Sequence, residues 1–385
     1  MKDLFYLLSI PTRNSDKLKL VSELKATVIN SKSIQDPSSA IHTIDLPSFK
    51  YGTLAACISL SEDLVKYDQQ ISSVLQKYIE SSDSLNLTTT FTIDELSPKD
   101  YVNGFLWNNF KYRRTNARLD EIAEAIMKNV NAHELDFKNK QQDYQIARGT
   151  LTQLERKQLG NLSTKSLAGV VSERDIVESD FLESLFVAVP LNHLKEWYNK
   201  YERLGKMVVP RSSNEIARDS EYALVNVSVF RKYKEDFAQA CRENKYIVRD
   251  FRFDSSLAQK SAEELEDARD KEKFELKKFS ESLKVVFSET FQALTHVKLL
   301  RLYVESVLRY GLPTDYAYVV INLDDKSSSK LLPPLIQHFA HLSPSLASKV
   351  NDKSGDVNIG GEYAGLLDQD IYPFPLFTLD SPRND

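Results

Sequence analysis

The chain contains one long segment without any helix-breaking residue. From Ser255 to Tyr310 there is no glycine and no proline, and a single helix of that length would extend roughly 80 Å at about 1.5 Å per residue. Ser256 and Gln259 have the spacing of a capping box at its start, and Gly311 can take the left-handed position that ends a helix. Apolar residues recur inside it at the 3-4-3 spacing of paired helices, namely Leu276, Phe279, Leu283 and Val286. The segment predicts one long helix packed against a partner helix.

A second segment, residues 115–159, also has the apolar spacing of a paired helix, but less regularly. Apolar residues step by threes and fours along it, but His133 and Lys140 interrupt the series and Gly149 weakens a helix by about 1 kcal/mol. Two helices separated by residues 160–254 predict an antiparallel stalk with a domain at its far end. We therefore expect an elongated molecule with two ends.

The residues between the two helices alternate between strand and helix patterns. Helical periodicity over 191–204 and 231–244 separates short Val-rich or apolar runs, and a polar loop follows Pro210 over residues 211–220. The expected strands cover residues 185–189, 207–209, 221–230 and 246–253. The order β-α-β-β-α-β predicts a ferredoxin-like domain.

The two ends of the chain are expected to form the other end of the molecule. Strand patterns lie at 4–10, 316–323 and 371–379, and helices are predicted at 61–80 and from Pro98, which Ser97 precedes as an N-cap. The expected fold class is α+β. The expected parts are an N-terminal foot segment (1–114), a first neck helix (115–159), a head (160–254), a second neck helix (255–310) and a C-terminal foot segment (311–385).

Composition excludes several functions. There are 50 Lys and Arg against 55 Asp and Glu, a formal charge of −5, whereas a dedicated nucleic-acid binder needs a basic surface. Two cysteines provide no disulfide framework and fit a reducing compartment. The N-terminal apolar run, residues 4–10, is too short to span a membrane and has no cleavage signal after it. We expect a cytosolic protein without direct membrane insertion.

No catalytic motif stands out. The chain has no P-loop, Rossmann fingerprint, G-x-S-x-G elbow or C-x-x-C pair. His338 and His341 are one helical turn apart and could share a metal, but two ordinary polar residues are the simpler interpretation. Cys57 and Cys241 are expected to be packing residues. We therefore predict no catalytic, cofactor-binding or metal-binding residues.

One basic and aromatic cluster remains ambiguous. Lys111, Arg113 and Arg114 lie beside Trp107, Phe110 and Tyr112. Such a cluster could bind a nucleic acid or an anionic lipid, while a junction between two helices is the simpler interpretation.

Several runs resemble one known family. They are Tyr303 to Pro313 (YVESVLRYGLP), Glu155-Arg156-Lys157, Gly160-Asn161-Leu162-Ser163, FVAVP at 186–190 and EYALVNVSVF at 221–230. Together they resemble the C subunit of the vacuolar-type proton ATPase (V-ATPase), and most closely its fungal members. Further landmarks, Ser48-Phe49-Lys50 and Asp68-Gln69-Gln70-Ile71, fall in family order along the same chain.

The resemblance implies a globular head, a helical neck and a foot built from both termini. It implies a non-catalytic stator subunit whose head binds one stalk of subunits E and G. Its foot would contact a second E-G stalk and the N-terminal domain of subunit a. Reversible attachment would control assembly of the two sectors on the cytosolic face of the vacuole or another endomembrane, and actin is a further candidate partner.

The predicted contact residues of the head are Arg211, Ser212, Ser213 and Asn214, on the polar loop between strands. Two other functions remain open from the residues alone. One is a cytosolic coiled-coil linker between cytoskeletal filaments and membranes. The other is an enzyme with its active site in the ferredoxin-like head.

Overall fold

The computed structural model describes residues 2–12, 16–30, 40–50, 52–85, 87, 91–112, 117–177, 179–251, 257–342 and 372–382. The chain divides into two compact units. Unit 1 comprises Met1–Asn139 and Phe279–Asp385, and unit 2 comprises Lys140–Lys278. The division falls within two long helices, α5 (Leu119–Leu159) and α8 (Leu257–Tyr310). Each unit combines helices with an antiparallel sheet, so the predicted α+β class is confirmed.

The sheet of unit 1 joins strands from both ends of the chain. Its order is β2-β7-β1-β8, and all neighbouring strands are antiparallel. The central strands pair over most of their length, with Leu7 of β1 opposite Val320 of β7 and Phe377 of β8. The strands are β1 (Lys2–Pro11), β2 (Ile41–Ile44), β7 (Tyr316–Asp324) and β8 (Leu376–Pro382).

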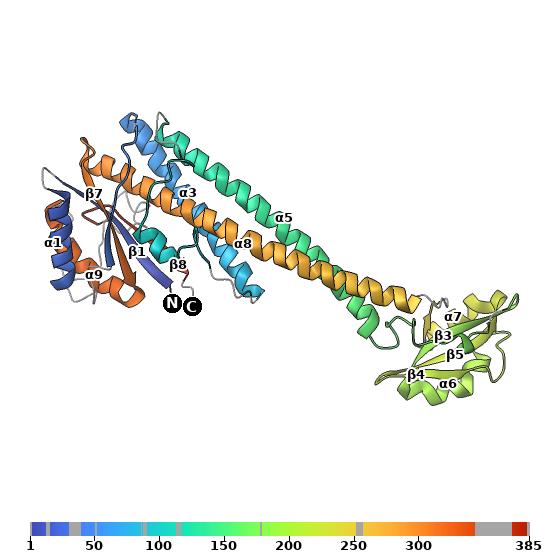
Figure 1. Cartoon of the computed structure of the whole chain (residues 1–385). Helices are drawn as coiled ribbons and strands as arrows, with labels where there is room; N and C mark the ends of the chain where they lie inside the picture. Colours follow the sequence, from blue (N-terminus) through green and yellow to red (C-terminus); the bar gives the residue numbers. More distant parts are fainter. Residues whose placement is uncertain are drawn as a thin grey trace, which may run out of the picture. The chain divides into compact units, whose positions relative to one another are not determined.

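Helices cover both faces of this sheet. Tyr6, Leu8 and Ile10 point to one face because side chains alternate along a strand, and they pack on helices α1 (Lys17–Asn30) and α9 (Asp325–His338). Figure 1 shows these two helices side by side along the sheet. On β1's other face, Phe5 and Leu7 are buried. The Tyr310 hydroxyl at the end of α8 donates a hydrogen bond to the Ser9 carbonyl.

Within unit 1, α3 (Leu54–Ser84) packs with the first part of α5 and the second part of α8. Phe137 of α5 lies between Tyr78 of α3 and Phe279 of α8, with ring centroids 4.6 and 5.5 Å away. The short helix α4 (Pro98–Asn103) begins as predicted, since the Ser97 hydroxyl accepts the Asp100 N–H at 3.1 Å. Helix α8 also ends as predicted, with Gly311 at φ +75°.

A buried ion cluster joins α3 to α8. Asp68 of α3 accepts Lys298 Nζ at 2.9 Å and pairs with Arg301, and its side chain is only 6% exposed. Both cations come from α8, and their side chains are 11% and 12% exposed. The Ser72 hydroxyl adds a longer contact of 3.4 Å. Two cations that have little contact with water therefore share one carboxylate.

Unit 2 has the predicted ferredoxin-like order of elements. Its sheet order is β4-β5-β3-β6, and its neighbouring strands are antiparallel. Alternate valines of β3 and β5 face the two helices, and Trp197 and Phe237 are fully buried between them. The elements are β3 (Leu182–Pro190), α6 (Leu194–Lys200), β4 (Asn214–Arg218), β5 (Tyr222–Phe230), α7 (Lys234–Glu243) and β6 (Ile247–Arg249). Five 3-10 turns complete the described elements: η1 (Glu173–Asp175), η2 (Leu191–His193), η3 (Tyr201–Arg203), η4 (Arg231–Tyr233) and η5 (Ala340–Leu342).

The predicted second strand of this domain was wrong. Residues 207–209 form only a single bridge, Val208 to Val229, and the true strand β4 lies inside the predicted polar loop. Met207 and Arg211 have positive φ angles, +58° and +55°, and Pro210 between them has no N–H to donate. The chain therefore turns before it can pair as a strand.

Two elements of unit 1, α1 and β2, were not predicted, and α9 was expected only as a C-terminal helix without bounds that carries His338. The predicted capping box of Ser256 and Gln259 at the start of α8 is not tested, because Ser256 and the Gln259 side chain lie outside the described residues. No helix in the described part of the chain is long and apolar enough to cross a bilayer.

Candidate partner-contact site

The most distinctive surface feature of unit 1 is a tight turn between α4 and α5, residues 105–112, called here the Phe110 turn. Asn108 closes it. The Asn108 side-chain oxygen accepts the N–H groups of Phe110 at 3.1 Å and Lys111 at 3.0 Å, and its carbonyl accepts the Tyr112 N–H at 3.0 Å. Asparagine favours such local bonds to its own backbone. The turn is thus built by one side chain.

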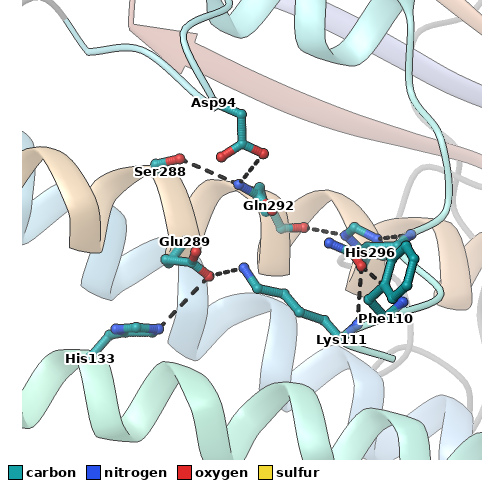
Figure 2. A network of polar contacts seen from close by, with 9 residues as sticks. Asp94, Phe110, Lys111, His133, Ser288, Glu289, Gln292 and His296 are labelled. Atoms are coloured by element: carbon teal, nitrogen blue, oxygen red, sulfur yellow. Dashed lines mark hydrogen bonds and ion pairs between the residues drawn. The ribbon is translucent and has the colours of Figure 1, made fainter. Parts of the chain in front are cut away.

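A buried histidine of α8 contacts the turn from the core of unit 1. His296 Nε2 accepts the Asn108 N–H at 3.2 Å, and Nδ1 lies 2.7 Å from the Gln292 carbonyl (Figure 2). A carbonyl can only accept and an N–H can only donate, so the imidazole is neutral with its proton on Nδ1. The ring lies 4.8 Å from both Trp107 and Tyr112. The position of the turn is therefore fixed by the core.

Two other residues of α8 near the histidine, Glu289 and Gln292, make polar contacts with neighbouring elements. Lys111 and Glu289 form an ion pair, and His133 Nε2 lies 3.8 Å from the same carboxylate. Gln292 Nε2 donates to Asp94 at 3.1 Å (Figure 2). The ion pair with Glu289 holds Lys111, so a carboxylate already matches its charge.

The turn leaves two apolar side chains in solvent. Phe110 is 98% exposed and Leu106 is 80% exposed, whereas Trp107 and Tyr112 are buried. A large apolar side chain presented from a fixed backbone loses little conformational entropy on binding, which is typical of contact residues at protein interfaces. The basic and aromatic cluster seen in the sequence thus separates into core and surface residues. Arg113 and Arg114 lie outside the described residues.

Burial of His296 should make unit 1 sensitive to acid. Desolvation lowers the pKa of His296 from 6.5 to about 4. An unfolded histidine binds a proton near pH 6.5, so between these values the unfolded chain holds more protons and the free energy of unfolding falls with falling pH. From pH 7 to pH 5 we expect a loss of about 2 kcal/mol from this group alone.

Urea unfolding at pH 7 and pH 5 tests this expectation. The His296→Gln side chain keeps an acceptor and a donor but does not titrate. The variant should therefore lose about 2 kcal/mol less of its free energy of unfolding between pH 7 and pH 5 than the wild type does. Equal pH dependence in both proteins would contradict a buried neutral histidine.

The structure gives the four predicted contact residues of unit 2 different roles. The Arg211 N–H donates to Glu202 at 3.0 Å, while the residue itself is exposed. The Ser212 hydroxyl donates to the Val209 carbonyl at 2.7 Å. Asn214 is exposed but is the first residue of β4, not a loop residue as predicted.

The remaining predicted residue is Ser213, whose hydroxyl accepts the Trp197 N–H at 2.9 Å. Ser212 and Ser213 are half-buried, and their hydrogen bonds hold the loop in place. Arg211 and Asn214 are the two predicted residues that are exposed to solvent.

The structure also places the two cysteines and the histidine pair considered in the sequence. Cys57 and Cys241 are buried, and desolvation raises the pKa of the Cys241 thiol to about 12, which keeps it protonated. Among the described residues, no group of three or more His, Cys, Asp or Glu side chains is placed to hold a metal ion. His338 and His341 are linked through the His338 carbonyl at 3.3 Å.

Comparison with known proteins gives one family. The family model that describes the C subunit of V-ATPase matches residues 5–374. The V-type proton ATPase C subunit 1 of Xenopus tropicalis is 34% identical over 383 residues, covering 98% of this chain and 97% of that protein. The Bos taurus protein of the same name is 36% identical over 344 residues, covering 87% and 88%.

One solved structure is also similar at a low level. It is the cytoplasmic N-terminal domain of subunit I, a homolog of subunit a of V-ATPase, with 14% identity and a TM-score of 0.34. The match covers 88% of this chain and 98% of that one. A TM-score of 0.34 is too low to indicate a shared fold.

Proposed function

The chain belongs to the family of V-ATPase C subunits, and on that premise we propose that it is a non-catalytic stator subunit of a V-type proton-pumping ATPase. The family match over residues 5–374 carries the proposal, because it includes residues of both units. In this role the chain links E-G peripheral stalks and the N-terminal domain of subunit a. Its attachment controls assembly of the ATPase and proton-translocating sectors on the cytosolic face of a vacuolar or other endomembrane.

The structure supports a connecting role through its two separate units. Unit 1 presents the Phe110 turn, and unit 2 presents Arg211 and Asn214. Two modest interfaces on one chain give strong attachment, since binding at one raises the effective concentration at the other. Loss of either interface would then release the subunit. The head, neck and foot arrangement, with its boundaries, remains a prediction within this proposal.

A binding titration tests the stator role. The whole chain is titrated against a purified E-G heterodimer and against the N-terminal domain of subunit a. Phe110→Ser should weaken one of these interactions at least about tenfold, because a central aromatic contact is often worth about 2 kcal/mol or more. Arg211→Ser should weaken an interaction made by unit 2. Leu135→Ser, which changes a 60% exposed residue of α5, is the matched control and should bind as the wild type does.

The same titration separates the alternatives. Stability should change by no more than about 0.5 kcal/mol in all three variants, because the altered side chains lie at the surface. If the wild-type chain binds neither partner, the stator role is wrong. Sedimentation with actin filaments in the absence of both partners would instead support the filament linker.

A further inference from the structure

Unit 1 contains a cavity of about 490 Å³ beside the buried ion cluster. That volume lies within the range of roughly 300 to 1,000 Å³ that is typical of ligand sites. The charged side chains that line it are spaced three and four residues apart on one face of α8: Lys298, Arg301, Glu305 and Arg309. Neither the family match nor the proposed stator role assigns a ligand to this cavity.

The charges at the cavity do not cancel. Lys298 and Arg301 share the single carboxylate of Asp68. Arg309 pairs with Glu305 at 2.6 Å and donates to the Tyr372 carbonyl at 2.8 Å. Three cations against two carboxylates leave one formal positive charge. A partly buried site with one excess charge favours a ligand with one negative charge.

The guanidinium groups also have unused donors. Within the described residues, Arg301 bonds to Asp68 through Nη1 only, and Arg309 uses Nε and Nη1. This leaves Nε and Nη2 of Arg301 and Nη2 of Arg309 without a protein partner in that part of the chain. The Arg301 guanidinium lies 4.4 Å from the centre of the Phe377 ring, which limits its orientation. Fixed planar donors of this kind match a carboxylate.

Apolar side chains form part of the remaining wall. Phe374 lines the cavity just before β8, Leu376 and Phe377 line it from β8 itself, and Val65 lines it from α3. A ligand that satisfied the arginine donors would therefore place its other atoms against aromatic and aliphatic groups.

We propose that this cavity binds one carboxylate attached to an apolar group. A free carboxylic acid and an acidic side chain of a peptide present the same chemistry, and the experiment distinguishes them. A phosphate monoester carries nearly two negative charges at neutral pH, so it would leave the site with an unbalanced negative charge.

Ligand-observed NMR on the whole chain tests this site with small probes. We expect 3-phenylpropionate to bind with a dissociation constant on the order of 1 mM, as suits a ligand of this size. The uncharged 3-phenylpropionamide should bind at least about tenfold more weakly, because it cannot make the charge-assisted hydrogen bond. The doubly charged phenyl phosphate should also bind at least about tenfold more weakly, because it leaves an unbalanced negative charge at the site. Equal binding of the amide, tighter binding of the phosphate, or no binding of the acid would each overturn the proposal.

A second pair of probes identifies the source of the carboxylate. Acetyl-Phe-Glu-amide is compared with acetyl-Phe-Gln-amide at the same site. Binding of the Glu peptide as tightly as the small acid, or more tightly, supports a peptide ligand. Binding of the small acid with exclusion of both peptides supports a free acid.

Variants locate the binding within the cavity. Arg301→Gln and Arg309→Gln should each weaken binding of 3-phenylpropionate about tenfold or more. Arg309 is the safer change, since its side chain is 33% exposed and it is not part of the Asp68 cluster. Lys284→Gln removes a positive charge from an exposed site of α8 away from the cavity and should bind normally. If Arg309→Gln binds as tightly as the wild type, the assigned site is wrong.

Discussion

Replacing Asp68 with leucine should destabilise unit 1 by about 3 to 5 kcal/mol, because it leaves two buried cations without a counter-charge. Lys298 and Arg301 are nearly enclosed and share this one carboxylate. Urea unfolding of a Trp197→Phe background measures the loss. In that background Trp107, which is buried in unit 1, is the single tryptophan and reports on this unit alone.

Two further variants test the explanation. Asp63→Ala removes an exposed ion pair with Lys66 from the same helix and should cost less than about 0.5 kcal/mol. The triple variant Asp68→Leu, Lys298→Met, Arg301→Met should recover most of the lost stability, since apolar side chains of similar size often replace a buried ion cluster without loss. An equal loss for Asp63→Ala and Asp68→Leu would show that burial is not the cause.

Phe237→Ala should destabilise unit 2 by about 3 to 5 kcal/mol, the usual cost of removing a large aromatic side chain from a core. Phe237 is fully buried against Trp197, and its ring also lies against Gly205. In a Trp107→Phe background, the fluorescence of Trp197 follows unfolding of this unit. We expect the midpoint of its urea transition to fall.

Two comparisons test whether the loss of stability comes from the core of unit 2. Tyr198→Ala changes an aromatic residue of α6 that is 41% exposed and should cost far less. The same Phe237→Ala change, observed through Trp107 with Trp197 replaced by Phe, should leave the transition of unit 1 nearly unchanged. A matched fall in both transitions would show that the two units unfold together.

The sequence predicted the elements whose patterns are regular. Val-rich runs predicted β3 and β5, and the absence of glycine and proline, with Gly311 at the end, predicted α8. Strand β4 was missed because Asn214–Arg218 is a polar edge strand that is buried only in part, with a bulge between Glu215 and Ala217. Such a strand has no alternating apolar pattern to detect.

The candidate site could not be predicted in the same way. The central bond of the Phe110 turn joins Asn108 to His296, 188 residues later. Sequence patterns cannot bring such residues together. The only local signal was the aromatic cluster, which did not show that Phe110 is exposed while Trp107 and Tyr112 are buried. The four cavity residues of α8 likewise lie within a helix in which charged side chains are frequent.

The pairing of β1 with β7 and β8 has a consequence for synthesis. β1 leaves the ribosome about 300 residues before its first partner, β7, an interval that takes on the order of 15 to 60 s at roughly 5 to 20 residues per second. Every strand and helix of unit 2 is translated within that interval. During this time β1 is an apolar strand with both edges open, the kind of segment that aggregates or binds chaperones. The nascent chain therefore has to protect β1 long before the sheet of unit 1 can form.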